Sequence, residues 1–200
     1  MHPNAAFRLD DRNLHEMLVE QIGFGMVFAE TPDGPRVAHT PIHSTGDGAM
    51  QFHLANGNAL TRHLPGATAL IVVNGPDAYV SPRWYEEEGQ VPTWNYVALE
   101  MEGRVRKMEA EGLADLLGAI GARNEGRLAG SNPWRPEQVP PDRWQKLFRG
   151  ITGFEMEVKA WRPTFKLSQN KSDEDRERVA DALENEGSPG IAQLMRNLSK

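Results

Sequence analysis

The sequence of 200 residues contains no cysteine, so it can form neither a disulfide nor a thiolate metal site. It has no run of about 18 apolar residues, the length that a transmembrane helix needs. Its N-terminal segment lacks the basic stretch followed by an apolar run that marks a signal peptide. From these absences we expect a protein of the cytoplasm with no membrane partner.

Sequence motifs of common nucleotide-binding and hydrolytic sites are also missing. The chain has no GxxxxGK[ST] loop, no GxGxxG between a strand and a helix, and no GxSxG elbow. Basic residues are also outnumbered by acidic ones: the chain has 22 Lys and Arg and 28 Asp and Glu, which gives a net charge of -6. Neutralising phosphates requires clustered Lys and Arg, so this charge does not support DNA as a partner.

The segments that are present have the pattern of an antiparallel β protein. Short apolar or alternating segments are separated by turn residues such as Gly, Pro, Asn and Asp, and no regular βαβ alternation occurs. This pattern predicts an α+β β-barrel of about six or seven mostly antiparallel strands with peripheral helices. We expect strands at 23–30, 36–44, 50–54, 69–73, 78–80, 97–105 and 154–160, with a turn at Asn74–Asp77.

Helical spacing and capping residues predict the helices. Asp10 and Asp11 are candidate caps of a first helix that ends near Ile22, and Ser172 is a candidate cap of an acidic helix. After residue 170 the composition changes, so we divide the chain into a barrel domain, 1–170, and a C-terminal helical appendage, 171–200, packed on it. Further helices are expected at 59–64, 113–120, 144–151 and from Ser188-Pro189 to Leu198.

The stretch Tyr79–Tyr96, YVSPRWYEEEGQVPTWNY, holds all three tyrosines and two of the five tryptophans. Large apolar side chains in a loop are costly to leave exposed to water. The rings therefore either fill the end of the barrel, or meet a second subunit, or cover a planar ligand. The residues alone leave these alternatives open.

The histidines do not predict a metal site. His39, His43 and His53 lie on adjacent predicted strands, but His39 and His43 are about 13 Å apart along one strand at about 3.3 Å per residue. No carboxylate spacing completes a ligand set, so hydrogen-bonding histidines are the preferred interpretation. His15-Glu16 begins an HExxH-like string, but Val19 stands where the second His belongs, which favours a solvated helix face.

Two polar segments are candidate ligand sites. The segment after the third strand, NGNALTRH, carries backbone N–H groups at a predicted helix start and Arg62 one turn later, which suits a phosphate. An ordinary capped helix explains the same residues equally well. Lys166–Asn170, KLSQN, either hydrogen-bonds a ligand or satisfies backbone groups at the barrel mouth.

Four strings together resemble a known family: AYVSPRWY, VPTWNYVAL, GFEMEV and FKLSQN. The chain is similar, from about Phe7 to Leu183, to the PaiB family of FMN-binding negative transcriptional regulators. These are flavin-reductase-like split barrels, related to pyridoxamine-phosphate-oxidase-like proteins. The resemblance implies a split-barrel homodimer with FMN at the subunit interface.

The resemblance also implies which residues bind FMN. The second strand would run along the flavin ring, and the segment after the third strand would hold the phosphate. Related oxidases often carry a more basic string there, whereas this chain has the single cation Arg62. The implied set is His39, Thr40, Pro41, His53, Asn56, Asn58, Thr61, Arg62, Trp84, Trp94, Asn95, Tyr96, Lys166 and Gln169.

Three functions follow as hypotheses. The first is an FMN-binding homodimer that acts, directly or indirectly, as a negative transcriptional regulator. The alternative is an FMN-dependent oxidoreductase of a small substrate, although no acid–base pair stands out and no catalytic residue is assigned. The third, direct DNA binding, is implied by the family's name but not by the charge of the chain.

Overall fold

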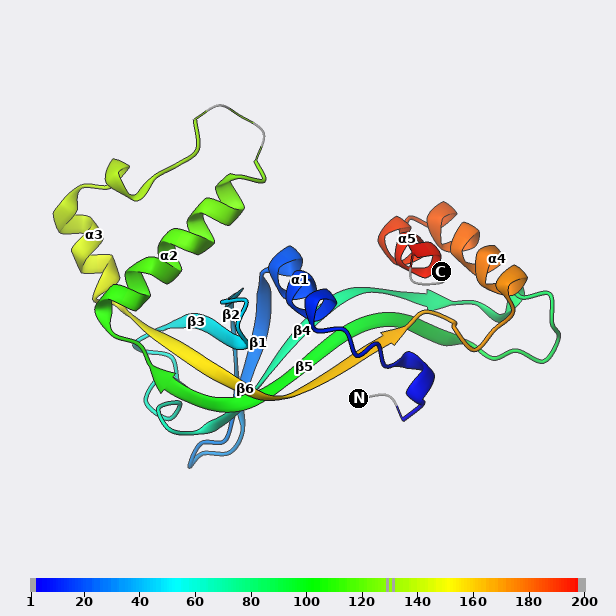
Figure 1. The fold of residues 1–200 in the computed structure, drawn as a ribbon, viewed down its shortest axis with the longest axis horizontal. Coiled ribbons are helices and arrows are strands. Elements are labelled where there is room, and N and C mark those ends of the chain that lie inside the picture. The colour runs from blue at the N-terminus through cyan, green and yellow to red at the C-terminus, as the bar shows by residue number, and fades with distance from the viewer. Residues whose placement is uncertain (1–2, 129, 131, 198–200) are drawn as a thin grey trace. The chain divides into compact units, whose positions relative to one another are not determined.

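The structure is a computed structural model that describes residues 3–128, 130 and 132–197. The described chain forms six strands, five α-helices and three short 3-10 helices, the first of which precedes α1. Figure 1 shows them as a ribbon coloured from the N-terminus to the C-terminus. The strands are β1 Phe24–Ala29, β2 Arg36–Ser44, β3 Ala49–Ala55, β4 Thr68–Val80, β5 Thr93–Lys107 and β6 Ile151–Lys166. The α-helices are α1 Arg12–Ile22, α2 Ala110–Glu125, α3 Pro141–Phe148, α4 Asp173–Asn185 and α5 Pro189–Asn197.

The strands form a closed barrel in the order β1-β2-β3-β6-β5-β4. Strand β1 pairs antiparallel with β2 and β4, and β3 pairs antiparallel with β2 and β6; for example, Val27 of β1 lies opposite Ala38 of β2 and Phe52 of β3 opposite Phe154 of β6. Along β5, buried residues alternate with less buried ones because successive side chains of a strand point to opposite faces. The predicted barrel with peripheral helices is therefore confirmed.

Chain contacts divide the protein into two compact units. The first unit comprises residues 3–15, 74–100 and 162–197 of the described chain, and includes α4 and α5. The second unit comprises 16–73 and 101–161, and includes β1, β2, β3, α2 and α3. The predicted domain boundary at residue 170 stays a prediction.

The helix predicted at 59–64 is wrong. This segment forms consecutive turns, in which the backbone N–H groups of Thr61 and His63 donate to the carbonyls of Asn58 and Leu60. The Asn58 side chain accepts from the Leu60 N–H at 2.9 Å, and Leu60 and its neighbour Leu64 are fully buried. Local side-chain bonds and the burial of two leucines thus replace a regular helix.

The turn predicted at Asn74–Asp77 is also wrong, because β4 runs through it without a break. A Cβ added at Gly75 would lie 2.9 Å from the Cβ of Val97, so the β4 backbone passes close to β5 there. Pairing between these long strands overrides the local preference of Asn, Gly and Pro for turns.

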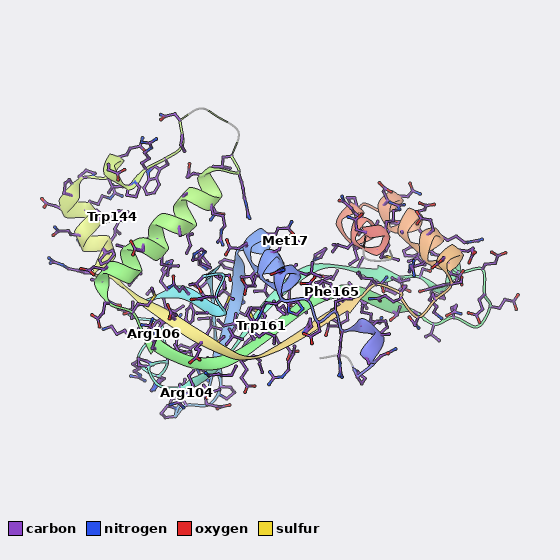
Figure 2. The ribbon with its side chains drawn as sticks, viewed as in Figure 1. Met17, Arg104, Arg106, Trp144, Trp161 and Phe165 are labelled. Atoms are coloured by element: carbon purple, nitrogen blue, oxygen red, sulfur yellow. The ribbon has the colours of Figure 1, made fainter. Side chains whose placement is uncertain are left out.

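Helix α1 begins as expected but buries a different face. The Asp11 carboxylate accepts from the N–H groups of Asn13 and Leu14 at 2.9 and 3.3 Å, which caps the first turn. His15 is 1% exposed, whereas Met17 is 51% exposed. Figure 2 labels Met17 on α1. The solvated position expected for His15 is therefore wrong: its Nε2 lies 2.6 Å from the Leu9 carbonyl oxygen, and its ring stacks on Phe165.

The C-terminal helices confirm their sequence signals. The Ser172 hydroxyl accepts from the Asp175 N–H at 3.1 Å and caps α4. Helix α5 begins at Pro189, the first-turn position that proline prefers. Ile151, which was assigned to the helix before it, is the first residue of β6. Leu198, the last residue of the expected apolar stripe, lies outside the described residues.

Candidate functional site

The predicted site residues lie in both units. Those of the second unit lie on β2, on β3 and in the turns after β3. Those of the first unit lie in the 3-10 helix Pro82–Trp84, at the start of β5, at the end of β6 and in the turn after β6. The second-unit group is His39, Thr40, Pro41, His53, Asn56, Asn58, Thr61 and Arg62. The first-unit group is Trp84, Trp94, Asn95, Tyr96, Lys166 and Gln169.

Strand β2 presents alternating side chains. Thr40 is buried, and its hydroxyl donates to the backbone carbonyl of His53 on β3 at 2.6 Å. His39 is exposed and Pro41 is half-buried, on the opposite face of the strand. Of this predicted trio, Thr40 fastens two strands together, whereas His39 and Pro41 remain available to a ligand.

His53 carries a buried nitrogen without a partner. Its Nδ1 atom is inaccessible to water and makes no hydrogen bond within the described part of the chain. Burial lowers the pKa of this imidazole below its ordinary value, so the ring stays neutral near pH 7. A buried polar atom of this kind is satisfied by a ligand or by a bound water.

The turns after β3 use most of their polar side chains internally. The Asn56 amide donates to the Arg149 carbonyl at 2.7 Å and accepts from the Thr152 hydroxyl at 2.7 Å. The Thr61 hydroxyl donates to the Ala55 carbonyl at 2.8 Å, and the Asn58 oxygen is already bound to the turn itself. These predicted residues therefore shape the segment.

Arg62 is the exposed cation of the same turns. Its Nε donates to the Nε2 of His63 at 2.8 Å, and this bond orients the Arg62 side chain. No other bond of its guanidinium is present among the described residues, so the two terminal nitrogens can bind an anion. A guanidinium binds phosphate oxygens with two parallel hydrogen bonds.

In the first unit, Asn95 is fully buried in a polar cluster. Its Nδ2 lies 2.9 Å from the Ser168 hydroxyl and 3.3 Å from the Met195 sulfur, and its Oδ1 accepts from the same hydroxyl at 3.2 Å. Tyr85 also hydrogen-bonds Ser168, and burial raises the pKa of its phenol. Asn95 thus joins β5, the turn after β6 and α5.

The KLSQN segment is a tight turn. Ser168 has a φ of 62°, in the left-handed region that few residues other than glycine adopt. The Gln169 side chain accepts from the Leu167 N–H at 2.7 Å and donates to the Phe165 carbonyl, so both of its ends are used. Gln169 holds the turn that orients Lys166 and Ser168.

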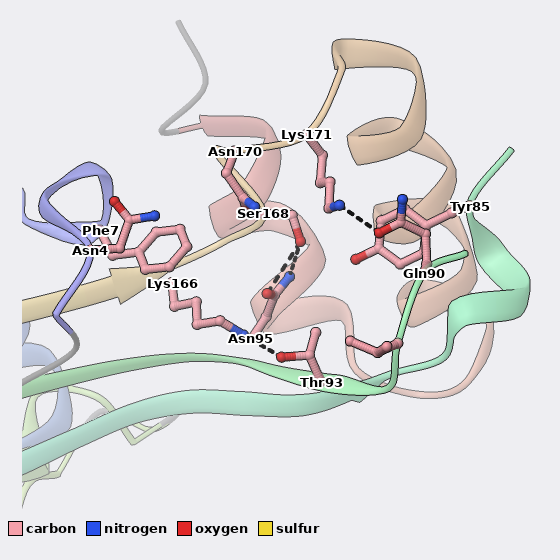
Figure 3. A pocket seen from close by; sticks show the side chains of 11 residues that line it. Asn4, Phe7, Tyr85, Gln90, Thr93, Asn95, Lys166, Ser168, Asn170 and Lys171 are labelled. Carbon is pink, nitrogen blue, oxygen red and sulfur yellow. Dashed lines mark hydrogen bonds between the residues drawn. The ribbon is translucent and has the colours of Figure 1, made fainter. Parts of the chain in front are cut away.

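Lys166 is half-buried. Its ammonium donates to the Thr93 hydroxyl at 2.6 Å and to the Trp94 carbonyl, and burial lowers its pKa. It lines a pocket of about 270 Å³ that lies wholly in the first unit (Figure 3). Phe7, Tyr85 and Lys171 line the same pocket but were not among the predicted residues. Lys171 directly follows KLSQN and Tyr85 belongs to the aromatic stretch, so both lay beside recognised signals.

The aromatic stretch divides into buried and exposed rings. Tyr85 is 8% exposed, whereas Tyr79 and Trp94 are 45% and 54% exposed and meet edge to face with centroids 6.2 Å apart. Trp84 and Tyr96 are half-buried. A second pocket, of about 480 Å³, is lined by Tyr79, Trp84 and Trp94. These rings do not fill the barrel, so a partner or a ligand remains as an explanation for the exposed pair.

His43 belongs to a network that the sequence did not reveal. Its Nδ1 lies 3.2 Å from the Glu20 carboxylate, which also accepts from the Ser44 N–H at 2.8 Å and from Arg123 at 3.1 Å. Burial opposes ionisation of Glu20, but these hydrogen bonds hold the pKa of the carboxyl below its usual value. A hydrogen-bonding role for this strand histidine is confirmed.

Comparison with known proteins gives the family. A family model described as "Putative FMN-binding domain" matches residues 1–160. The chain belongs to this family. It is also 31% identical, over 88% of its length and 86% of the relative's, to "Protease synthase and sporulation protein PAI 2" of Bacillus subtilis. The resemblance to the PaiB family is therefore confirmed.

Solved structures of this family's fold agree with the barrel. The FAD and heme binding protein of Mycobacterium smegmatis matches with a TM-score of 0.61 at 15% identity, over 84% of this chain and 77% of that one. The flavocytochrome Anf3 of Azotobacter vinelandii matches with a TM-score of 0.55 at 14% identity, over 86% and 79%. At these identities the likeness concerns the fold alone.

Within the described residues, no helix is long and apolar enough to cross a membrane.

Proposed function

We propose that the protein binds FMN and forms a homodimer of the PaiB type. The observation that carries the proposal is the match of the FMN-binding family model to residues 1–160, which span β1 to β5 and most of β6. When bound, the flavin supplies redox chemistry, while the protein supplies binding, orientation and electrostatics.

The second unit offers groups that fit a flavin mononucleotide. Arg62 provides an exposed guanidinium for the phosphate, and His53 provides a buried nitrogen that lacks a partner. His39 and Pro41 present one accessible face of β2 for the ring. Arg62 is the one Arg or Lys in the second-unit group of predicted residues. The contribution of the FMN phosphate to affinity should therefore depend on Arg62.

Riboflavin, which lacks the phosphate, tests this assignment. We expect the full chain to bind FMN at least about tenfold more tightly than riboflavin, the ratio that one charge-assisted contact provides. Arg62→Gln should reduce this preference, whereas Arg36→Gln, at an exposed arginine of β2, should keep it. Equal affinity for both flavins in the unaltered protein would remove Arg62 from the phosphate site.

We place the dimer contact at the exposed rings of the first unit. Trp94 and Tyr79 expose about half of their surface, and aromatic side chains are enriched at protein interfaces. Such rings are costly to leave in water unless they meet a partner or a flat ligand. The mass of the protein in solution, measured with and without FMN, tests this part of the proposal.

Negative transcriptional regulation enters the proposal through the family resemblance, and we infer that it is indirect. The net charge is -6, and the first turn of α4 carries Asp173, Glu174 and Asp175. DNA binding requires clustered cations. We expect no gel shift of the gene's own promoter at physiological salt; a specific shift would establish direct action instead.

An FMN-dependent oxidoreductase of a small substrate is the second candidate. The pocket beside Lys166 favours it, because burial shifts the pKa of both Tyr85 and Lys166, and shifted pKa values are common at reactive sites. Oxidation of NAD(P)H that requires added FMN would support this candidate. No oxidation with a range of small acceptors would count against it.

A further inference from the structure

We propose that the pocket lined by Lys166 and Lys171 binds a small organic anion, either a carboxylate or a phosphate monoester. The pocket lies wholly in the first unit, between the N-terminal segment, the loop before β5 and the turn after β6 (Figure 3). It uses none of the second-unit residues to which the FMN phosphate is assigned. Lys166 and Asn95, which line the pocket, also belong to the FMN set that the resemblance implies. Anion binding here does not require bound FMN, and competition with FMN distinguishes the two uses of these residues.

The charge of the lining points to an anion. Two of the eleven residues that line the pocket are lysines, and none of the eleven is acidic. The whole chain, in contrast, carries six more acidic than basic residues. An anion that enters the pocket therefore meets positive charge from two side chains and no negative charge from the lining. Within the described chain, no carboxylate forms an ion pair with either Lys166 or Lys171.

Both ammonium groups keep hydrogen-bonding capacity. Each has three N–H donors. Lys166 uses two of them, on the Thr93 hydroxyl and the Trp94 carbonyl. Lys171 uses one, on the Gln90 side-chain oxygen at 2.5 Å, and its Nζ lies 5.4 Å from the centre of the Tyr85 ring. Three N–H donors therefore remain for a ligand or for water.

The pocket is built by groups that are fixed elsewhere. Gln90 donates its amide to Glu87 at 2.7 Å, which turns its oxygen toward Lys171. Asn95 and Ser168, both buried, bond to each other and form part of the wall. A site whose polar groups are positioned before the ligand arrives loses less entropy on binding.

The apolar part of the lining indicates an organic ligand. Phe7 is 3% exposed and Tyr85 is 8% exposed, while Val91 at the rim is largely exposed. A volume of about 270 Å³ lies just below the range of about 300–1,000 Å³ that accommodates drug-sized ligands. The pocket therefore suits a compact molecule with one anionic group and a short apolar body, smaller than a whole FMN.

Matched probes separate charge from shape. We would titrate the full chain with benzoate, phenyl phosphate and neutral benzamide by calorimetry, with inorganic phosphate as an anion that lacks an apolar body. At least one of the two aromatic anions should bind with one site per chain, and benzamide should not. The tighter of the two identifies the class, carboxylate or phosphate ester.

Variants assign the binding to the pocket. Lys171→Gln should lower the affinity for the preferred anion by about tenfold, the effect of losing one charge-assisted contact. Lys107→Gln, at an exposed lysine of β5 in the second unit, is the matched control and should bind normally. Lys166 also hydrogen-bonds Thr93, so Lys166→Gln could disturb the fold. Anion binding by Lys166→Gln is therefore interpreted only if its thermal melt stays cooperative. If the melt is not cooperative, Lys171→Gln alone decides the test.

Three results would overturn the proposal. The first is that none of the anions binds at millimolar concentration. The second is an equal loss in Lys171→Gln and Lys107→Gln, which would indicate a general charge effect. The third is competition between FMN and the preferred anion, which would make the pocket part of a flavin site. Failure of FMN binding with intact anion binding would contradict only the proposed cofactor.

Discussion

At the scale of single residues, buried polar groups with fixed partners dominate the candidate regions. Asn95 joins three elements of the first unit, Thr40 joins two strands, and Gln169 closes a turn. All three belong to the set of residues that is predicted to bind FMN. Their side chains, however, face other protein groups, and only tertiary structure reveals this.

Asn95→Ala should destabilise the protein. The change removes the bonds to Ser168 and Met195 and leaves the buried Ser168 hydroxyl with one partner fewer. We expect the free energy of unfolding to fall by about 2 kcal/mol, measured by urea denaturation. Asn170→Ala, at an exposed position of the same region, should leave stability unchanged. Equal effects of the two changes would show that the hydrogen bonds of the buried Asn95 do not contribute to the free energy of unfolding.

His53 should make stability depend on pH. Burial lowers its pKa in the folded state, so between that value and about 6.5 the unfolded chain binds more protons than the folded one. Stability from this group is complete above about pH 6.5 and is lost as the pH falls below it. His53→Gln should lose less stability than the unaltered protein between neutral and mildly acidic pH, measured by thermal melts. Parallel curves would exclude His53 as the cause.

At the scale of elements, close approach of strands decides the barrel. A Cβ added at Gly103 of β5 would lie 2.0 Å from the Glu157 carbonyl oxygen of β6, a distance that real Cβ atoms do not show. The same addition at Gly118 of α2 meets nothing within 4 Å. One residue type thus has opposite roles in a strand and in a helix.

Gly103→Ala and Gly118→Ala should therefore change stability in opposite directions. Overpacking at Gly103 should lower the free energy of unfolding by about 2 kcal/mol or more. Alanine at Gly118 should raise it by up to about 1 kcal/mol, because alanine favours helix over glycine. Urea denaturation measures both. A neutral Gly103→Ala would show that β5 and β6 can separate there without cost.

The sequence predicted the elements that carry strong local signals. Asp11 and Ser172 cap their helices as expected, and β2 has the predicted bounds. Predictions failed where tertiary contacts override local preference. β4 crosses a turn-like segment and pairs with β5 and β1 in the barrel, and the 59–64 segment forms turns around two buried leucines. The missed members of the Lys166 pocket come from three separate segments, which no local pattern connects.

At the scale of the whole molecule, the exposed rings of the aromatic stretch should matter more than its charged tip. Trp94 is 54% exposed and packs edge to face on Tyr79, whereas Glu87 is an exposed residue bonded to Gln90. Trp94→Ala should lower either the fraction of protein that is dimeric or the amount of FMN that it retains. Glu87→Ala should change neither. Light scattering and flavin absorbance measure the two properties. Identical behaviour of both variants would mean that Trp94 faces neither partner nor flavin.

The proposed function depends above all on flavin binding by this chain. Equilibrium dialysis of the 200-residue chain against FMN, with bound flavin quantified by its absorbance, tests this binding directly. We predict saturable binding that approaches one FMN per chain, with a dimeric mass in the same sample. No binding above that of an unrelated protein at millimolar FMN would contradict the proposed function.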